Sequence, residues 1–512
     1  MTELFYPSGL PSGQGLVRLR ELRDLLQPRE VLRFRDVGVD GIGFHSREVR
    51  PGNLFFAIRG AAGDGAKYAT EAVARGAVAV VAEEPLAVPC PVLVVDDCRA
   101  ALADTARHYY RDPSRAVSVV GITGTNGKTT TAHLTRACLQ ADRRQVGLMG
   151  TIAYEFGGRR IPASNTTPDP VRIQGYLREM ADRHASACVM EVSSHSLDQQ
   201  RVRGVRFAVG VFTNLTQDHL DYHKTMDGYA AAKSRLFEML EPGTSAVLNV
   251  DDPASRRMAA VMGSSVQALW YGMKGAGDLR AENLVYSADG TRFDLVLPGM
   301  RTEVFLGLVG PHNVQNALAA AGAALSLGVS EMTIAAALED VRPVPGRLEL
   351  VEAPRGMRDQ GIRVFVDYAH TPDALDKICA CIKGVAEGRL VVVFGCGGDR
   401  DRTKRPLMAR AVAKWADLAV LTSDNPRNED PEAILDEVQQ GLAGVQVPWL
   451  RVTDRSEAIR AAVAEARPGD TVLIAGKGHE NYQIFQGTTV PFDDRQEASR
   501  ALAAKGGGWL PR

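Results

Sequence analysis

The amino-acid sequence predicts an α/β protein with three domains. These are a small N-terminal α/β domain, a central domain with a mainly parallel sheet, and a C-terminal doubly wound domain. The chain has 512 residues, more than one hydrophobic core usually supports, so roughly three domains are expected. Near-continuous apolar runs also alternate with helical patterns, which is typical of parallel strands that helices bury on both faces.

The first segment, residues 1–113, contains three short strand patterns around a helical pattern at Ala66–Arg75. The strand patterns are Leu54–Ile58, Ala77–Ala82 and Val92–Val95. Arg111–Ser114 carries the turn residues of a linker, which places the first domain boundary there.

The second segment, residues 114–342, alternates buried strands with helices. Its apolar runs are Val117–Ile122, Ala187–Val192, Phe207–Thr213 and Ser245–Val250. Residues 266–309 are irregular or antiparallel in pattern, and a helix is expected over Val314–Leu327.

The third segment, residues 343–512, begins at the breaker cluster Pro343–Gly346. The strands expected there are Val364–Val366, Leu390–Phe394, Leu418–Thr422 and Thr471–Ala475, separated by helices such as Pro406–Trp415. This is a Rossmann-like doubly wound pattern, so the loops at the carboxyl ends of its strands are the expected site.

Composition and charge exclude several functions. Lys+Arg 60 against Asp+Glu 61 gives a net charge of -1, so no bulk field favours nucleic acid or an anionic membrane. No apolar stretch approaches the ~20 residues of a membrane span. Met1–Phe5 lacks the basic and apolar regions of a secretory signal. We therefore expect a cytoplasmic protein with no nucleic-acid partner and no membrane insertion.

The seven cysteines are scattered along the chain. Cys379 and Cys381 lie close together, but no second Cys/His pair completes a metal site. Buried free thiols in a reducing compartment are the better interpretation.

A glycine-rich segment, Gly124–Thr130, connects a predicted strand to the helical pattern Thr131–Leu139. It reads Gly124, Thr125, Asn126, Gly127, Lys128, Thr129 and Thr130. A strand that turns through glycines into a helix start offers backbone N–H groups to an anion; the lysine adds charge and a hydroxyl can reach Mg²⁺. The generic P-loop spacing is not met, because Ile122 stands where its first glycine belongs. We predict a P-loop ATPase-like polyphosphate site; the alternative is a turn with a stray lysine.

Acidic and histidine side chains follow two other strands of the same segment. Glu191 ends the run Ala187–Met190, where a carboxylate can hold Mg²⁺ opposite the loop hydroxyls. The alternative is a helix N-terminal glutamate. Asn214–His223 contains two histidines and two aspartates, which suit metal binding or proton transfer, or helix capping.

Six motifs in one order resemble the Mur ligase family over about residues 41–495. They are Gly124–Thr130, Glu191–His195, Asn214–His223, Gly310–Asn316, Pro345–Arg347 and Asp367–His370. The resemblance implies an ATP-dependent ligase that forms amide bonds in bacterial cell-wall precursors. Phe394–Arg400, Asp424–Arg427 and Gly476–Glu480 are most similar to members that add meso-diaminopimelate to UDP-N-acetylmuramoyl-L-alanyl-D-glutamate.

That resemblance implies ATP and Mg²⁺ as cofactors, an acyl-phosphate intermediate and a role in peptidoglycan synthesis. We also expect a monomer. Sibling ligases of the lysine-adding or folylpolyglutamate type are the alternatives. Arg427 argues against lysine as the amino acid that is added. Ser46 and Asn165–Thr167 argue against a folate substrate. A P-loop ATPase switch module, from a different class, would turn over ATP without an amine substrate.

The resemblance also implies roles for individual residues. Lys128, Glu191, His219 and Lys233 are the expected catalytic residues. Nucleotide contacts are expected from Gly124–Thr130, Asn313, Asn316, Arg347 and Asp367. Metal contacts are expected from Thr129, Thr130, Glu191, His219 and Lys233 as a carbamate, a bidentate anion that can hold Mg²⁺. Without the resemblance, the sequence predicts that Lys233 is a solvent-exposed lysine on a helix.

Two substrate sites complete the expectation. UDP-substrate contacts are expected from Ser46, Asn165, Thr166, Thr167, Ser193, Gln199 and Arg201. Diaminopimelate contacts are expected from Arg400, Asp424, Asn425, Pro426, Arg427, Gly476 and Glu480, since arginine forks suit carboxylates. The ordinary alternatives are turns at Asn165–Pro168 and Asn425–Pro426. His45–Arg47 departs from the Asp-Ser-Arg form usual in the family, and Asn53 stands where aspartate is common.

Overall fold

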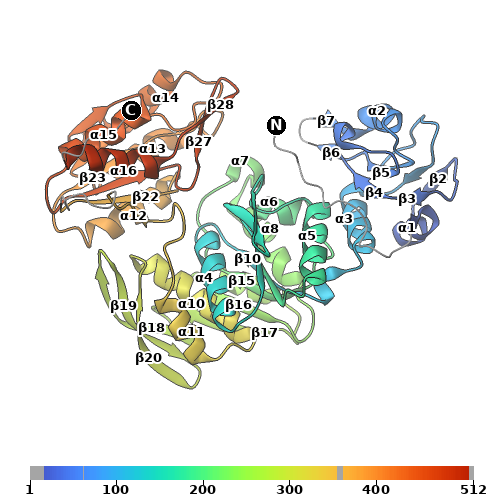
Figure 1. Cartoon of the computed structure of the whole chain (residues 1–512), viewed down its shortest axis with the longest axis horizontal. Coiled ribbons are helices and arrows are strands. Elements are labelled where there is room, and N and C mark those ends of the chain that lie inside the picture. Colours follow the sequence, from blue (N-terminus) through green and yellow to red (C-terminus); the bar gives the residue numbers. More distant parts are fainter. Residues whose placement is uncertain (1–15, 61–62, 354–360, 507–512) are drawn as a thin grey trace.

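The computed structural model describes residues 16–60, 63–353 and 361–506. It shows three large sheets, each drawn from one of the three expected segments, and three two-stranded ones (Figure 1). The N-terminal segment Met1–Phe5 lies outside the described residues. The domain boundaries at 113 and 342 stay predictions. None of the helices within the described ranges combines the length and the apolarity that a membrane span requires.

The first domain is built on a five-stranded sheet with the order β2-β9-β8-β5-β4. The strands are β2 (Glu30–Leu32), β4 (Gly41–Gly43), β5 (Asn53–Phe56), β8 (Ala79–Ala82) and β9 (Val92–Val94); the helices are α1 (Leu19–Leu26), α2 (Ala69–Ala74) and α3 (Cys98–Tyr109). Only α2 was expected from the sequence. Asp97 caps α3 by accepting hydrogen bonds from two N–H groups of its first turn.

The central domain contains an eleven-stranded sheet whose middle is parallel, as predicted. In sheet order the strands are β13 (Arg159–Pro162), β12 (Ala153–Phe156), β11 (Val146–Met149), β14 (Ala187–Glu191), β10 (Ser118–Thr123), β15 (Phe207–Phe212), β16 (Ser245–Asn249), β17 (Gln267–Gly272), β18 (Leu279–Ser287), β19 (Gly290–Leu297) and β20 (Met300–Leu306). Adjacent residues Val119 and Val120 pack into different cores, because consecutive side chains of a strand face opposite sides. Helices therefore cover both faces of this sheet.

Its helices are α4 (Lys128–Ala141), α5 (Pro170–Asp182), α6 (Ser194–Asp198), α7 (Leu220–His223), α8 (Met226–Glu238), α9 (Ser255–Ala260), α10 (Pro311–Ser326) and α11 (Glu331–Glu339). For residues 266–309 the antiparallel alternative is correct for β18–β20, whereas β17 extends the parallel part.

The third domain has a six-stranded sheet with the order β21-β22-β26-β23-β24-β25. The strands are β21 (Glu349–Leu350), β22 (Arg363–Asp367), β23 (Leu390–Phe394), β24 (Leu418–Leu421), β25 (Trp449–Arg451) and β26 (Thr471–Ala475), with a hairpin of β27 (Tyr482–Phe485) and β28 (Thr488–Pro491). The helices are α12 (Pro372–Lys383), α13 (Lys404–Ala413), α14 (Pro431–Gln439), α15 (Arg455–Glu465) and α16 (Asp494–Lys505). The doubly wound prediction is confirmed, since β22, β26, β23, β24 and β25 pair in parallel.

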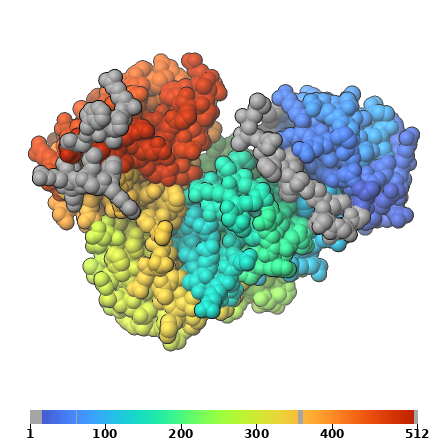
Figure 2. All heavy atoms as spheres, in the orientation of Figure 1, coloured from blue at the N-terminus to red at the C-terminus, as the bar shows by residue number. Residues whose placement is uncertain are grey.

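The first and third domains stand apart on either side of the central one (Figure 2). All seven cysteines are free, and five of them are buried, in line with the sequence prediction.

Candidate functional site

The phosphate-type loop is the turn between β10, which ends at Thr123, and α4, which begins at Lys128. Gly127 caps the helix with φ +85°, and a Cβ there would collide with the Asn316 amide. A Cβ at Gly124 would collide with the Thr213 hydroxyl. Glycine is therefore required at both positions, by backbone conformation and by close packing.

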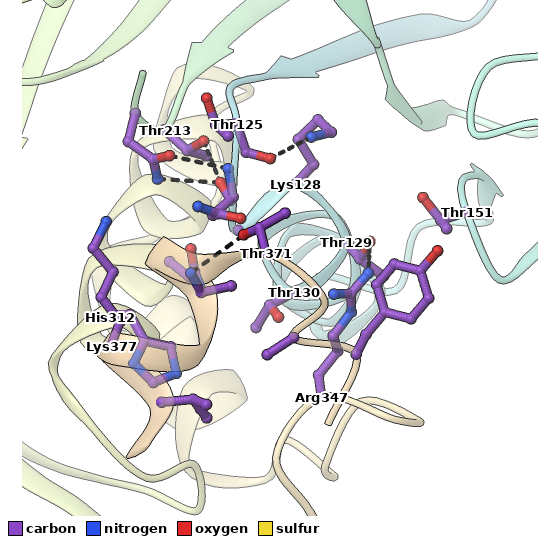
Figure 3. A pocket seen from close by; sticks show the side chains of 18 of the residues that line it. Thr125, Lys128, Thr129, Thr130, Thr151, Thr213, His312, Arg347, Thr371 and Lys377 are labelled. Atoms are coloured by element: carbon purple, nitrogen blue, oxygen red, sulfur yellow. Dashed lines mark hydrogen bonds between the residues drawn. The ribbon is translucent and has the colours of Figure 1, made fainter. Parts of the chain in front are cut away.

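Lys128 folds over this loop. Its Nζ donates hydrogen bonds to the carbonyls of Gly124 and Thr125, each at 2.8 Å. Figure 3 shows the bond to Thr125. Burial lowers the pKa of the ammonium, and the nearby carboxylate of Glu191 acts in the opposite direction. The loop thus concentrates a lysine and a helix N-terminus at one point, which suits an anion.

Glu191 ends β14, which pairs in parallel with β10, so its carboxylate reaches the loop. The side chain is 1% exposed and accepts a hydrogen bond of 2.9 Å from the Thr129 hydroxyl. Thr151, which the sequence analysis missed, donates from its backbone N–H at 2.8 Å and from its hydroxyl at 3.0 Å. Glu191 therefore faces Thr129 and is a strand residue, not a helix cap.

A cavity of about 290 Å³ lies over the loop, between the central and third domains (Figure 3). The expected nucleotide residues from outside the loop all line it: Asn313, Asn316, Arg347 and Asp367. Arg347 Nη2 donates to the Thr129 hydroxyl at 3.1 Å. Asp367 accepts N–H groups at 2.7 and 2.8 Å, and burial raises its pKa.

A second cavity of about 640 Å³ adjoins the first, and His219 lines both. Six of the seven expected diaminopimelate residues line this second cavity: Arg400, Asp424, Asn425, Arg427, Gly476 and Glu480. Pro426 lies in the same loop, with its carbonyl packed against Gly398. Two arginines and two carboxylates among the expected residues thus line one cavity beside the phosphate loop.

Three family models match the chain in order. Residues 38–110 match the model described as Mur ligase family, catalytic domain. Residues 122–324 match the Mur ligase middle domain, and residues 346–478 match the Mur ligase glutamate ligase domain. The UDP-N-acetylmuramoyl-L-alanyl-D-glutamate--2,6-diaminopimelate ligase of Geobacter metallireducens is 45% identical, with 96% of this chain and all of that protein covered.

The chain belongs to the Mur ligase family. A ligase of the same name from Geobacillus thermodenitrificans is 46% identical, with 89% of this chain and 93% of that protein covered. A solved structure of a ligase with this name is 34% identical, with a TM-score of 0.68 over 96% of this chain and 99% of that one. The three-domain α/β architecture predicted from the sequence is thereby confirmed.

Lys233 in this family member is buried, so the interpretation as a solvated helix lysine is wrong. The side chain lies on α8 with 1% exposure. Its Nζ donates to the Gly124 carbonyl at 2.8 Å and lies 4.4 Å from the Tyr229 ring centroid. Burial lowers the pKa of Lys233 well below its ordinary value, and the charge of Lys128 lowers it further.

Four of the expected UDP-substrate residues of the central domain form one hydrogen-bonded set. Thr167 donates to the Glu191 carbonyl at 2.8 Å and accepts from the Ser193 N–H at 3.0 Å. Arg201 donates to the Thr167 carbonyl at 3.1 Å and to Gln199 Oε1 at 2.7 Å. This set therefore adjoins the phosphate loop through Glu191.

The remaining expected UDP contacts are held by local bonds. The Asn165 carbonyl accepts from the Tyr154 hydroxyl at 2.6 Å, and the hydroxyls of Thr166 and Thr151 are hydrogen-bonded at 3.1 Å. Ser46 donates to Glu71 at 2.8 Å, within the first domain.

The side chains beside the phosphate loop indicate what kind of metal ion the site could hold. Over the described ranges, no group of three or more His, Cys, Asp or Glu side chains is placed to hold a metal ion. Thr129 and Glu191 supply oxygen donors beside the phosphate loop. Mg²⁺ prefers one or two carboxylates with phosphate oxygens and water, so these residues fit Mg²⁺ with a nucleotide better than a metal held by protein alone.

Proposed function

We propose that the chain is an ATP-dependent ligase that adds meso-diaminopimelate to UDP-N-acetylmuramoyl-L-alanyl-D-glutamate in peptidoglycan precursor synthesis. The observation that carries the proposal is the cavity of about 640 Å³ in which Arg400, Arg427 and Glu480 lie beside the phosphate loop. The relatives that match nearly the whole chain bear this name.

The phosphate loop and Lys128 would hold the β- and γ-phosphates of ATP. Asn313 and Asn316 would approach the adenine, while Arg347 and Asp367 close the cavity from the third domain. Mg²⁺, held by Thr129 or Thr130 with Glu191 and His219, would neutralise phosphate charge. Phosphoryl transfer depends on such positioning and charge neutralisation, so the protein needs little covalent chemistry of its own.

The reaction joins two substrates that different domains hold. The γ-phosphoryl group of ATP passes to the side-chain carboxylate of D-glutamate, which gives an acyl phosphate and ADP. The amine of diaminopimelate then attacks the acyl carbon, and inorganic phosphate leaves. His219 lines both cavities, so the two half-reactions share one wall.

Lys233 would act as a carbamate. A neutral amine is the form that adds CO₂ and loses a proton, and the lowered pKa of Lys233 favours the neutral form. We expect Lys233→Met to lose most activity and formate to restore part of it, measured as ADP release. Full activity of Lys233→Met without formate would exclude this role.

The pocket chemistry selects the amino acid. Guanidinium forks at Arg400 and Arg427 suit the carboxylates of diaminopimelate, and Glu480 suits its distal amine. L-Lysine lacks the second carboxylate, so the two-arginine pocket disfavours a lysine-adding sibling. A folylpolyglutamate-type ligase and an ATPase switch module are likewise not favoured, because the relatives that match nearly the whole chain are named as diaminopimelate ligases.

Mass spectrometry of the product tests the proposal. With ATP, Mg²⁺ and the UDP-dipeptide, we expect the mass of the UDP-dipeptide to increase by one diaminopimelate less water. Preferential addition of L-lysine at equal concentration would contradict it. We also propose a cytoplasmic monomer, which cell fractionation and light scattering would test.

A further inference from the structure

A fully buried lysine lies behind the proposed diaminopimelate cavity. Lys477 follows β26 and has no exposed surface. Its Nζ donates to Asn425 Oδ1 and to Glu480 Oε2, each at 3.1 Å, and lies 3.9 Å from Asp424 Oδ1. The ammonium therefore contacts three residues that line the cavity.

These contacts orient Glu480. Asn425 Nδ2 also donates to Glu480 Oε2, at 2.9 Å, so Lys477 and Asn425 meet the same carboxylate oxygen. Asn425 is fixed in turn, because its Oδ1 accepts the Ile484 N–H at 3.1 Å. Among the described residues no hydrogen bond reaches Glu480 Oε1, and Glu480 lines the cavity. One oxygen is held and the other is available to a ligand.

Two carboxylates face the Lys477 ammonium. Lys477 carries one positive charge, and Asp424 and Glu480 carry one negative charge each, which leaves a sum of -1. The nearby Arg455 is balanced by Asp494. This local excess of negative charge beside the open oxygen of Glu480 suits a positively charged group of a ligand, while Arg400 and Arg427 of the same cavity suit its carboxylates.

We propose that Lys477 is a positioning residue that sets specificity for the distal amine of the amino-acid substrate, by holding Glu480 with Oε1 directed at that amine. This inference rests on the proposed function. It assigns to Lys477 a role through Glu480 and Asn425, without contact to the substrate.

Kinetics of Lys477→Met test the proposal, with the exposed Lys414→Met of the same domain as the matched control. Loss of a hydrogen bond to a charged group predicts that KM for meso-diaminopimelate rises about 10- to 100-fold. KM for ATP stays close to that of the control, whereas the melting temperature falls, because loss of the ammonium leaves the carboxylates of Glu480 and Asp424 without their buried counter-charge. A wild-type preference for diaminopimelate over 2-aminopimelate, which lacks the distal amine, is expected to narrow in Lys477→Met. An unchanged KM and an unchanged preference would overturn the inference.

A double-mutant cycle separates positioning from general stabilisation. If Lys477 acts through Glu480, the increase in KM caused by Lys477→Met shrinks in a Glu480→Gln background. If the increases in KM caused by the two single substitutions simply multiply in the double variant, the inference is overturned. If Lys477→Met shows no native melting transition, a crystal structure of the wild type with meso-diaminopimelate tests the positioning role instead. We expect Glu480 to bridge Lys477 and the distal amine; a Glu480 turned away from Lys477 would overturn the inference.

A wild-type enzyme with no diaminopimelate-dependent activity refutes the proposed function. An active wild type whose kinetics do not depend on Lys477 refutes only the positioning role.

Discussion

Arg427 occupies a backbone conformation that few residues other than glycine adopt, with φ +53°. Its backbone N–H donates to the Ile484 carbonyl at 2.9 Å, and its own carbonyl accepts from Gln486 at 2.6 Å. Its Nη1 donates to the Gly398 carbonyl at 2.7 Å. Backbone and side chain are thus both fixed, which is the arrangement expected of a residue that must present one face to a ligand.

We predict that Arg427→Ala raises KM for meso-diaminopimelate by about 10- to 100-fold, because a charge-assisted pair with a carboxylate is lost. KM for ATP changes little, since Arg427 lines only the larger of the two cavities. Steady-state kinetics with each substrate varied in turn provide the measurement. The exposed Arg402, which pairs with Glu437, supplies the control Arg402→Ala. Equal increases in both KM values would refute the carboxylate-binding role.

His312 gives a prediction about pH. Burial, and secondarily the charge of Lys377, lower its pKa to about 4, against 6.5 ordinarily. Between these values the unfolded chain binds more protons, so stability falls as pH drops from about 6.5 to about 4. His312→Gln should remove about 1–3 kcal/mol of that loss. Melting temperatures of the nucleotide-free protein from pH 4 to 8 provide the measurement, with the exposed His184→Gln as control. Identical pH profiles for all three proteins would contradict it.

The sequence motifs predict candidate site residues, but they do not predict which other side chains contact and orient those residues. Thr151 contacts Glu191 only because β11 pairs with β14, and nothing local to Thr151 indicates this. Lys477 stands within a motif that the sequence analysis singled out. Its partner Asn425 is 52 residues away, so the contact depends on how the sheet is assembled. The burial of Lys233 likewise required the fold.

Among the elements, the parallel strands were predictable because they are apolar on both faces. Val391 and Val392 of β23 pack into different cores, as such a strand requires. The antiparallel strands β18–β20 alternate in burial and left two alternatives open. The helices α1 and α3 were not predicted, although Asp97 before α3 is an ordinary capping signal.

A buried ion pair connects four elements of the third domain. Arg455 at the start of α15 pairs with Asp494 at the start of α16 at 2.7 Å, and both side chains are 0% exposed. Arg455 Nη2 also donates to the Ala475 carbonyl, at the end of β26, at 3.0 Å, and Nη1 to the Ser423 carbonyl after β24 at 3.4 Å. The pair thus holds the two loops that carry Asp424 and Gly476.

We predict that Asp494→Asn lowers the free energy of unfolding by about 3–5 kcal/mol, because it leaves a buried guanidinium without its counter-charge. Thermal and urea denaturation followed by circular dichroism provide the measurement. Asp376→Asn is the control, since it breaks the exposed pair with Lys414 and should cost no more than about 1 kcal/mol. A loss for Asp494→Asn no larger than that of the control would contradict the role given to this pair.

At the scale of the whole molecule, the central and third domains build one continuous site. Arg347 reaches from the third domain to Thr129 in the phosphate loop, and His219 of the central domain lines the cavity that contains Arg427. The first domain lies on the side of the central domain opposite to the third domain (Figure 1). Because the phosphate site and the amino-acid pocket share walls, ATP turnover should depend on what occupies both.

In this account, ATP turnover by the chain is coupled to the joining of two substrates. ADP release in the presence of Mg²⁺, with the UDP-dipeptide and meso-diaminopimelate supplied together and omitted in turn, measures that coupling directly. We predict rapid ADP release only when both are present, with one tripeptide product formed for each ADP. Equal ADP release with neither substrate present would contradict the claim and favour an ATPase switch module.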